Sequence, residues 1–215
     1  MFPDFLENPS DVAAPLLLGC TLTRTITLNG EKHKLVARIV ETEAYDQDDP
    51  ASHAFGGPSE RNAAMFGPAG HLYVYVSYGM HHCCNVVCGP EGFGSGCLVR
   101  AVEPLEGTAA MRELREAGRA GKVHTGHAGK EQAERARKHP LKLRDLTNGP
   151  GKVCAALSVD KGLYGHDLKV EPLVLDFAPL LPGETIGCSP RVGISKNADA
   201  LKRFFIEGNA FVSRV

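Results

Sequence analysis

Alternating apolar and polar residues are the first pattern along the chain, and they predict a protein rich in β-strands. Residues 21–28 (TLTRTITL) alternate almost strictly, and the Asn29-Gly30 pair that follows is a strong signal for a hairpin turn. Residues 32–44 are therefore predicted to form the returning strand. A second hairpin is expected where Gly79 permits a turn between residues 72–78 and 83–88.

Shorter apolar runs bounded by turn residues predict the remaining strands, which are residues 97–102, 173–176, 191–195, 204–206 and 211–213. Capping and turn residues predict the helices. These are residues 12–18, capped by Ser10-Asp11 and ended by Gly19, residues 108–117, capped by Thr108, and residues 150–158, opened by Pro150.

Two segments lack a hydrophobic period. Residues 46–70 are polar and rich in Gly and Pro, so we predict one long loop that contains His53, Arg61 and Asn62. Loops of this length are usually functional or disordered, and we favour function because this one separates two strands of interest. Residues 118–140 are rich in Gly, His and charge, and we predict a mobile loop or a weak helix there.

A chain of 215 residues without repeats or an obvious linker favours a single domain over residues 1–215. A chain of this length buries roughly 70% of its unfolded surface, so a sizeable core is possible.

Composition narrows the class of protein. The net charge of −1 argues against wholesale electrostatic attraction to nucleic acid or membranes, although residues 112–144 are locally basic. No apolar run approaches the roughly 20 residues of a membrane span. The acidic N-terminus lacks the layout of a signal peptide, and seven cysteines without a regular framework fit reduced thiols. We therefore expect a cytoplasmic protein without membrane partners, associated with the nucleoid if its source is bacterial.

Glu43 is the sharpest candidate for chemistry, because it follows Ile39 and Val40 in an apolar strand. A buried carboxylate is costly unless it is paired or functional. It could simply pair with a neighbouring arginine. Glu41 lies two residues earlier on the same strand face, about 6.6 Å away by strand rise, which is near the carboxylate spacing of inverting glycosidases.

Tyrosines form the second candidate group. Tyr73 and Tyr75 fit ordinary strand packing. Tyr78 differs because it adjoins Gly79 at the expected turn, where a large ring would project outward. Projecting wedges of this kind can enter a minor groove and unstack a base step.

Two further patterns carry weaker alternatives. Cys83, Cys84, Cys88 and Cys97 lack the paired spacing of zinc sites, so buried thiols in a β-core are favoured and no metal is predicted. Residues 149–152, at a helix start, could bind phosphate through free N–H groups and the Lys152 ammonium, or simply begin the helix.

Read in order, the blocks RIVETEAY, ASHAFGG, RNAAMFGPAGHLYVYVSYGM, CCN, LVRAVEPLEG, NGPGK and RVGI resemble the alkyladenine (3-methyladenine) DNA glycosylase family. The resemblance covers roughly residues 15–215. It departs from the usual pattern at His81-His82, where other members carry bulkier aromatic or apolar residues. It implies a mixed α/β (α+β) single domain with a curved, largely antiparallel sheet, flanking helices and a protruding, DNA-inserting β-hairpin. It also implies hydrolytic removal of alkylated or deaminated purines from duplex DNA.

Carried over position by position, the resemblance implies roles for single residues. Glu43 corresponds to the general base, and Arg100 and the Val192 backbone correspond to groups that help to hold the attacking water. The expected base-binding pocket comprises Tyr45, His53 and Tyr75 as walls and Asn85 as the residue that disfavours guanine. The expected DNA-inserting tip comprises Tyr78, Gly79 and Met80, and the expected backbone contacts are Arg61, Gly151 and Lys152.

The partner implied is damaged double-stranded DNA, bound by a monomer without a cofactor. Two alternatives remain open at this point. One is a non-catalytic nucleic-acid-binding protein that uses the same hairpin, and the other is a small-molecule glycoside hydrolase that uses Glu41 and Glu43.

Overall fold

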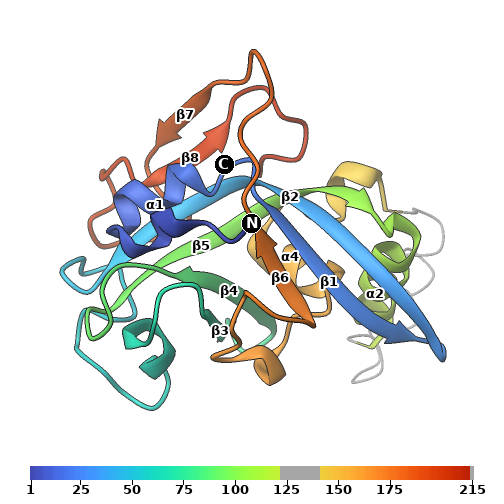
Figure 1. Cartoon of the computed structure of the whole chain (residues 1–215), viewed down its shortest axis with the longest axis horizontal. Helices are drawn as coiled ribbons and strands as arrows, with labels where there is room; N and C mark the ends of the chain where they lie inside the picture. Colours follow the sequence, from blue (N-terminus) through green and yellow to red (C-terminus); the bar gives the residue numbers. More distant parts are fainter. Residues whose placement is uncertain (122–140, 214–215) are drawn as a thin grey trace.

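A computed structural model describes residues 1–121 and 141–213 of the chain, and it contains a strongly curved antiparallel sheet (Figure 1). The strand order is β3-β4-β5-β2-β1-β6, with β8 paired to β2 and β7 paired to β8. The strands are β1 (Thr21–Leu28), β2 (Glu31–Asp46), β3 (Leu72–Ser77), β4 (His81–Val87), β5 (Ser95–Glu106), β6 (Leu173–Asp176), β7 (Ile186–Ser189) and β8 (Arg203–Ile206). The mixed α/β fold with a curved antiparallel sheet is the one predicted.

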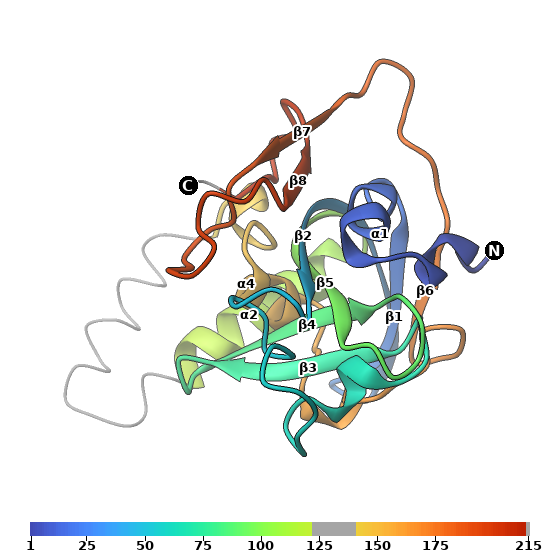
Figure 2. The ribbon, with the colours of Figure 1, turned by 90° about the vertical axis from the view of Figure 1, so that its left-hand side faces the viewer.

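Helices flank this sheet. The α-helices are α1 (Ser10–Leu16), α2 (Thr108–Gly121) and α4 (Pro150–Ala156). Single 3₁₀ turns occur at η1 (Asp4–Glu7), η2 (Ala63–Phe66), η3 (Leu143–Asp145) and η4 (Lys161–Leu163). Helix α1 packs on β2, whereas α4 packs on β4 and β5 and supports α2, as the two ribbon views show (Figures 1 and 2).

Strand β2 is the centre of the sheet, because β1, β5 and β8 all pair with it. Residues 39–44 are buried without interruption, since both faces of the strand are covered. Thr42 points toward α1, where its Oγ1 donates a hydrogen bond to the Ala14 carbonyl. Glu41 and Glu43 therefore share the opposite face, beside two register irregularities that twist the strand locally.

The core lies mainly between the sheet and helices α1 and α4. Ala13, Ala14 and Leu17 are fully buried against the middle of β2. A second, smaller cluster lies under the loop of residues 46–70 and comprises Ala54, Met65, Tyr73 and Val87. This small cluster holds the long loop against β3 and β4, next to the predicted site.

Two of the strand predictions were wrong. Residues 191–195 form bends instead, because Pro190 has no N–H to donate and the Val192 N–H bonds to the Glu43 side chain. Residues 211–213 do not form a strand either, since the Ser213 N–H donates to Glu41. Strand β7, which lies just before Pro190, was not predicted.

Helix α1 begins earlier than predicted. No side chain caps its first turn, and Ser10 Oγ donates to Asp46 instead, at 2.7 Å. Gly19, with φ of 96°, follows the helix as expected. Of the predicted segment 118–140, residues 118–121 belong to α2 and the rest lies outside the described residues.

In residues 1–121 and 141–213, no helix is both long and apolar enough to cross a membrane.

Gly94 allows the loop that carries His53 to approach the sheet closely. A Cβ at this position would lie 2.6 Å from Phe66 Cζ and 2.7 Å from Ala54 Cβ. We predict that Gly94→Ala lowers the free energy of unfolding by about 1–3 kcal/mol, the usual cost of overpacking. Urea unfolding checks this. Gly56→Ala is the matched control, because a Cβ there meets nothing within 4 Å; equal losses in both variants would contradict the packing argument.

Candidate active site

Glu43 is fully buried on β2 and its carboxylate is bonded on both oxygens. Its Oε1 accepts a hydrogen bond from the Val192 N–H at 2.8 Å and lies 3.3 Å from Arg100 Nη1. Its Oε2 accepts from the Tyr45 hydroxyl at 2.9 Å. Tyr45 follows two residues later on the same strand face, as the alternation predicted. Glu43 is thus in direct contact with Arg100 and Val192, which were predicted to help hold the water, and with Tyr45, which was predicted to be a wall of the pocket.

Glu41 uses its hydrogen-bonding capacity on different partners. Its Oε1 accepts from Arg100 Nε at 3.1 Å, from Arg203 Nε at 2.6 Å and from Ser213 Oγ at 2.7 Å. Its Oε2 accepts from the Ser213 N–H at 2.6 Å. A carboxylate held by two arginines and a serine has a structural explanation without any catalytic role.

Arg100 links these two carboxylates. Its Nε contacts Glu41 and its Nη1 contacts Glu43, while only 7% of the residue is exposed. Burial opposes the charge of this guanidinium, but Glu43 and Glu41 outweigh that effect and raise the pKa of Arg100. The arginine therefore stays cationic and offsets the two buried negative charges.

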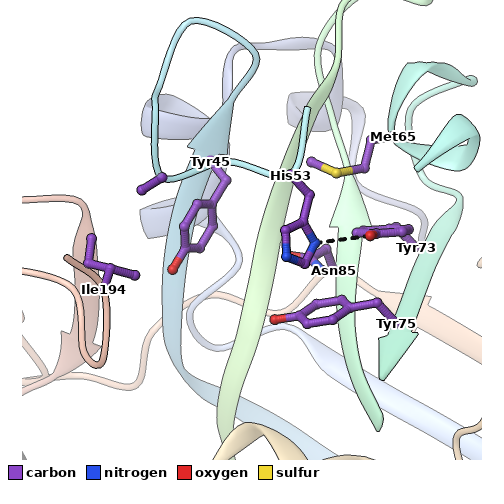
Figure 3. A pocket seen from close by; sticks show the side chains of 8 residues that line it. Tyr45, His53, Met65, Tyr73, Tyr75, Asn85 and Ile194 are labelled. Carbon is purple, nitrogen blue, oxygen red and sulfur yellow. Dashed lines mark hydrogen bonds between the residues drawn. The ribbon is translucent and has the colours of Figure 1, made fainter. Parts of the chain in front are cut away.

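A cavity of about 110 Å³ opens beside this network. In Figure 3, Tyr45 stands on one side of the space, and His53 and Tyr75 stand on the other. The lining residues come from β2, the long loop, β3, β4 and the segment after β7, and they are Tyr45, Ala51, His53, Met65, Tyr73, Tyr75, Asn85 and Ile194. The structure thus brings all four predicted pocket residues together, and it adds Ala51, Met65, Tyr73 and Ile194.

Three rings form one continuous wall of the cavity. The His53 ring meets the Tyr75 ring edge-on, with centroids 4.6 Å apart, and Tyr73 stacks on Tyr75 at 5.5 Å. His53 Nδ1 and the Tyr73 hydroxyl share a hydrogen bond of 3.0 Å. Tyr73 is packed in the core of β3, as predicted, and it also contacts the pocket residue His53.

The pKa of the His53 imidazole is lowered, which favours the neutral ring at neutral pH. Desolvation is the main cause that lowers its pKa below the ordinary 6.5, and the positive charge of Arg61 adds to this effect. A neutral ring at neutral pH can stack against a cationic group without repelling it.

The opposite wall has a support that sequence reasoning missed. The Arg191 guanidinium lies over the Tyr45 ring, 4.6 Å from its centroid, and pairs with Asp49 at 2.6 Å. Arg191 Nη1 also donates to the Ala44 carbonyl. Arg191 directly precedes Val192 in the RVGI block, which is the one signal in the sequence that could have indicated it. Nothing in the sequence singles out Asp49.

The β3–β4 hairpin ends in the predicted exposed turn. Tyr78, with φ of 49°, is 84% exposed, and Met80 is 65% exposed. Gly79 has φ of 67° and nothing within 4 Å of its Cβ position. The prediction that the Tyr78 ring projects outward is confirmed, whereas its insertion into DNA stays a prediction.

The predicted backbone-contact residues lie at two separate places. Gly151 lies against the hairpin, since a Cβ there would be 3.0 Å from that of His81. Lys152 donates to Asn148 at 2.7 Å, and with Tyr78 it borders the same surface pocket. Arg61 is exposed on the long loop and its charge acts on the Tyr73 hydroxyl. Gly151 and Lys152 therefore lie together beside the hairpin, whereas Arg61 lies on the loop that carries His53.

The predicted buried thiols are confirmed for the four cysteines in question, which are Cys83, Cys84, Cys88 and Cys97. In the described part of the chain, no group of three His, Cys, Asp or Glu side chains could hold a metal ion.

Comparison with known proteins identifies the family of the chain. A family model described as methylpurine-DNA glycosylase (MPG) matches residues 4–210. The chain belongs to the methylpurine-DNA glycosylase family. It is a DNA glycosylase, a hydrolase of DNA repair, as the motifs predicted.

The glycosylase also aligns with curated relatives that are named "Putative 3-methyladenine DNA glycosylase". That of Nitrosospira multiformis is 42% identical, over 98% of this chain and 92% of its own length. That of Methanoculleus marisnigri is 40% identical, over 98% and 96% respectively. That of Agrobacterium fabrum is 45% identical, over 82% and 77%.

Asp49 should give the glycosylase a pH-dependent part of its stability. Burial alone would raise the pKa of this carboxyl, but hydrogen bonds from Arg191, the Ala51 N–H and Asn197 lower it to about 2, against 3.8 for a free side chain. The depressed pKa stabilises the fold above pH 3.8, and the contribution is lost as the pH falls toward 2. Asp49→Asn should therefore lower the free energy of unfolding by roughly 2 kcal/mol at pH 7.

Urea unfolding at pH 7, 5 and 3 checks this, and the gap between wild type and Asp49→Asn should narrow at pH 3. Asp199→Asn is the control, because it removes an exposed carboxylate two positions after Asn197, which itself contacts Asp49. A gap that stays constant with pH would show that Asp49 acts through packing alone.

Proposed function

We propose that this glycosylase flips alkylated or deaminated purines out of duplex DNA and hydrolyses their N-glycosidic bond with water activated by Glu43. The substrate class comprises 3-methyladenine, 7-methylguanine, hypoxanthine and ethenoadenine, and the product is an abasic site. One observation carries the proposal: a buried carboxylate is hydrogen-bonded to the tyrosine that walls a ring-lined cavity.

Binding follows from the cavity walls. A base inside a duplex is out of reach, so it must be extruded, at a cost of a few kcal/mol that is least for damaged pairs. Stacking of the extruded base between Tyr45 on one side and His53 and Tyr75 on the other contributes about 1–3 kcal/mol of binding free energy per base–aromatic contact. An alkylated purine that carries positive charge also gains a cation–π interaction with the tyrosine rings.

Chemistry follows from the position of Glu43. Its carboxylate takes a proton from water, the resulting hydroxide adds to the sugar C1′, and the C1′–N bond breaks as the base leaves with the bonding electrons. A cationic base leaves as a neutral molecule, so a second acid is not needed for it. Arg100 and the Val192 N–H both contact Glu43 itself, and we infer that they act by orienting the carboxylate toward the water.

Selectivity and DNA binding use the remaining residues. Asn85 is 4% exposed and borders the cavity, where its bulk would meet the exocyclic amine of guanine. Tyr78, with Gly79 and Met80, would fill the gap left in the duplex. Arg61, Gly151 and Lys152 would contact the phosphate backbone. We place these functions in one monomeric domain of residues 1–215, acting in the cytoplasm or nucleoid.

The two alternative functions predict different effects of substituting Glu41 and Glu43. A small-molecule glycoside hydrolase would need both Glu41 and Glu43, yet the structure holds Glu41 by four contacts to Arg100, Arg203 and Ser213. A non-catalytic DNA-binding protein would not need Glu43 at all.

We predict that Glu43→Gln slows release of hypoxanthine from a duplex by about 10²–10⁴-fold, the usual contribution of a general base. Single-turnover excision with enzyme in excess measures this. Binding to the same duplex should persist, because Gln keeps the shape of the side chain. Release by Glu43→Gln as fast as by wild type would contradict the assignment of Glu43 as the general base.

Glu41→Gln is the matched control on the same strand face. It should lower the free energy of unfolding by about 3–5 kcal/mol, because it leaves buried arginines without a counter-charge. Equal catalytic losses from both variants, with stability unchanged, would favour the glycoside hydrolase.

Tyr78→Ser should weaken binding to a duplex with an abasic site by about fivefold to a hundredfold, which corresponds to the loss of one stacked ring. The melting temperature should not change, since the ring is 84% exposed in the free protein. Fluorescence anisotropy and thermal unfolding measure the two quantities. A melting temperature lower by many degrees would instead assign Tyr78 to the fold.

A further inference from the structure

Tyr45 is covered by a cation on the face that points away from the cavity. Arg191 does not line the cavity, its side chain is fully buried, and its guanidinium lies 4.6 Å from the centroid of the ring. The tyrosine therefore has a cation behind it and, when a base is bound, a purine in front of it.

The charges behind Tyr45 form a small balanced cluster. Arg191 pairs with Asp49 at 2.6 Å, and Lys202 lies 3.6 Å from Asp49 and 3.4 Å from Asp46. Two cations and two carboxylates cancel, but the guanidinium is the member in contact with the ring. Losing Arg191 would leave a net negative charge behind Tyr45, whereas losing the Asp49 carboxylate would leave a net positive one.

We propose that the Arg191–Asp49 pair sets the preference of the pocket between cationic and neutral damaged bases, acting through Tyr45. The inference rests on the function proposed above, and Arg191 is a specificity-determining residue that touches the wall of the pocket and not the base.

Electrostatics gives the direction of the effect. A cation on one face of an aromatic ring draws electron density of the ring toward itself. The opposite face of the ring then attracts a second cation less strongly. The guanidinium and a cationic base on Tyr45 would also repel each other across the ring. The nearby Asp49 carboxylate offsets part of that repulsion. A neutral base such as hypoxanthine feels neither effect to first order.

The size of the effect should be moderate. With an effective dielectric constant near 20 and charges roughly 8–10 Å apart, partly offset by the counter-charge, we expect about a threefold to tenfold change in relative efficiency. The pocket of the wild-type protein is thereby tuned toward neutral lesions without losing cationic ones.

The test compares kcat/KM for 7-methylguanine, which is cationic, with that for hypoxanthine, which is neutral, in otherwise identical duplexes. Relative to wild type, Arg191→Met should raise the ratio of cationic to neutral release by about threefold to tenfold, and Asp49→Asn should lower it. Arg191→Lys keeps the charge and should hold the ratio within about twofold, which makes it the matched control. A merely structural role would slow both substrates alike and leave the ratio unchanged.

Opposite shifts from Arg191→Met and Asp49→Asn support the inference, and ratios unchanged in both variants overturn it. If Arg191→Met does not fold, Asp49→Asn decides the matter by the direction of its shift. Wild type that releases neither base overturns the proposed function together with the inference, whereas release with unchanged ratios overturns the inference alone.

Discussion

Arg100 lies between two carboxylates that the fold buries completely, and the geometry of the site depends on this shared guanidinium. Without it, Glu41 and Glu43 would place two like charges on one face of a strand away from water, which is prohibitively costly unless each is paired. The two carboxylates also have different structural roles. Glu41 anchors the arginine, and the arginine holds Glu43 in place.

Residues 191–213 make several of the contacts that hold these two carboxylates. The N–H groups of Val192 and Ser213 bond to carboxylate oxygens on β2 instead of joining a strand, and Arg203 reaches Glu41 from β8. Polar contacts therefore fix where these segments run. The same segments bring Arg191 against the Tyr45 ring, so one stretch of chain contacts both the Glu43 carboxylate and a wall of the pocket.

The sequence predicted those parts of the fold that depend on local patterns. The alternation in residues 21–28, the Asn29-Gly30 turn and the Gly79 turn each specify a local conformation, and the structure has all of them. The strands expected at 191–195 and 211–213 failed because their backbone N–H groups bond to buried side chains far away in sequence, which no local pattern encodes. Motif resemblance identified Glu43, Tyr45, His53, Tyr75 and Asn85, and the structure brings them together.

Residues that act through a neighbouring side chain could not be predicted from the sequence. Asp49 is one of several acidic residues in a polar loop, and only the folded chain shows that it pairs with Arg191 behind the pocket. Tyr73 read as an ordinary strand residue, because its hydrogen bond to His53 spans 20 positions. Such contacts depend on tertiary packing, and the residue types alone do not encode them.

The central claim is that Glu43 positions water against the sugar of a flipped nucleotide. A crystal structure of the protein bound to a duplex with a cationic, non-hydrolysable abasic nucleotide tests it most directly. The account predicts the nucleotide outside the helix, Tyr78 in the vacated stack, and one ordered water within hydrogen-bonding distance of both Glu43 and the cationic centre. A flipped nucleotide whose cationic centre contacts no water held by Glu43 would contradict it.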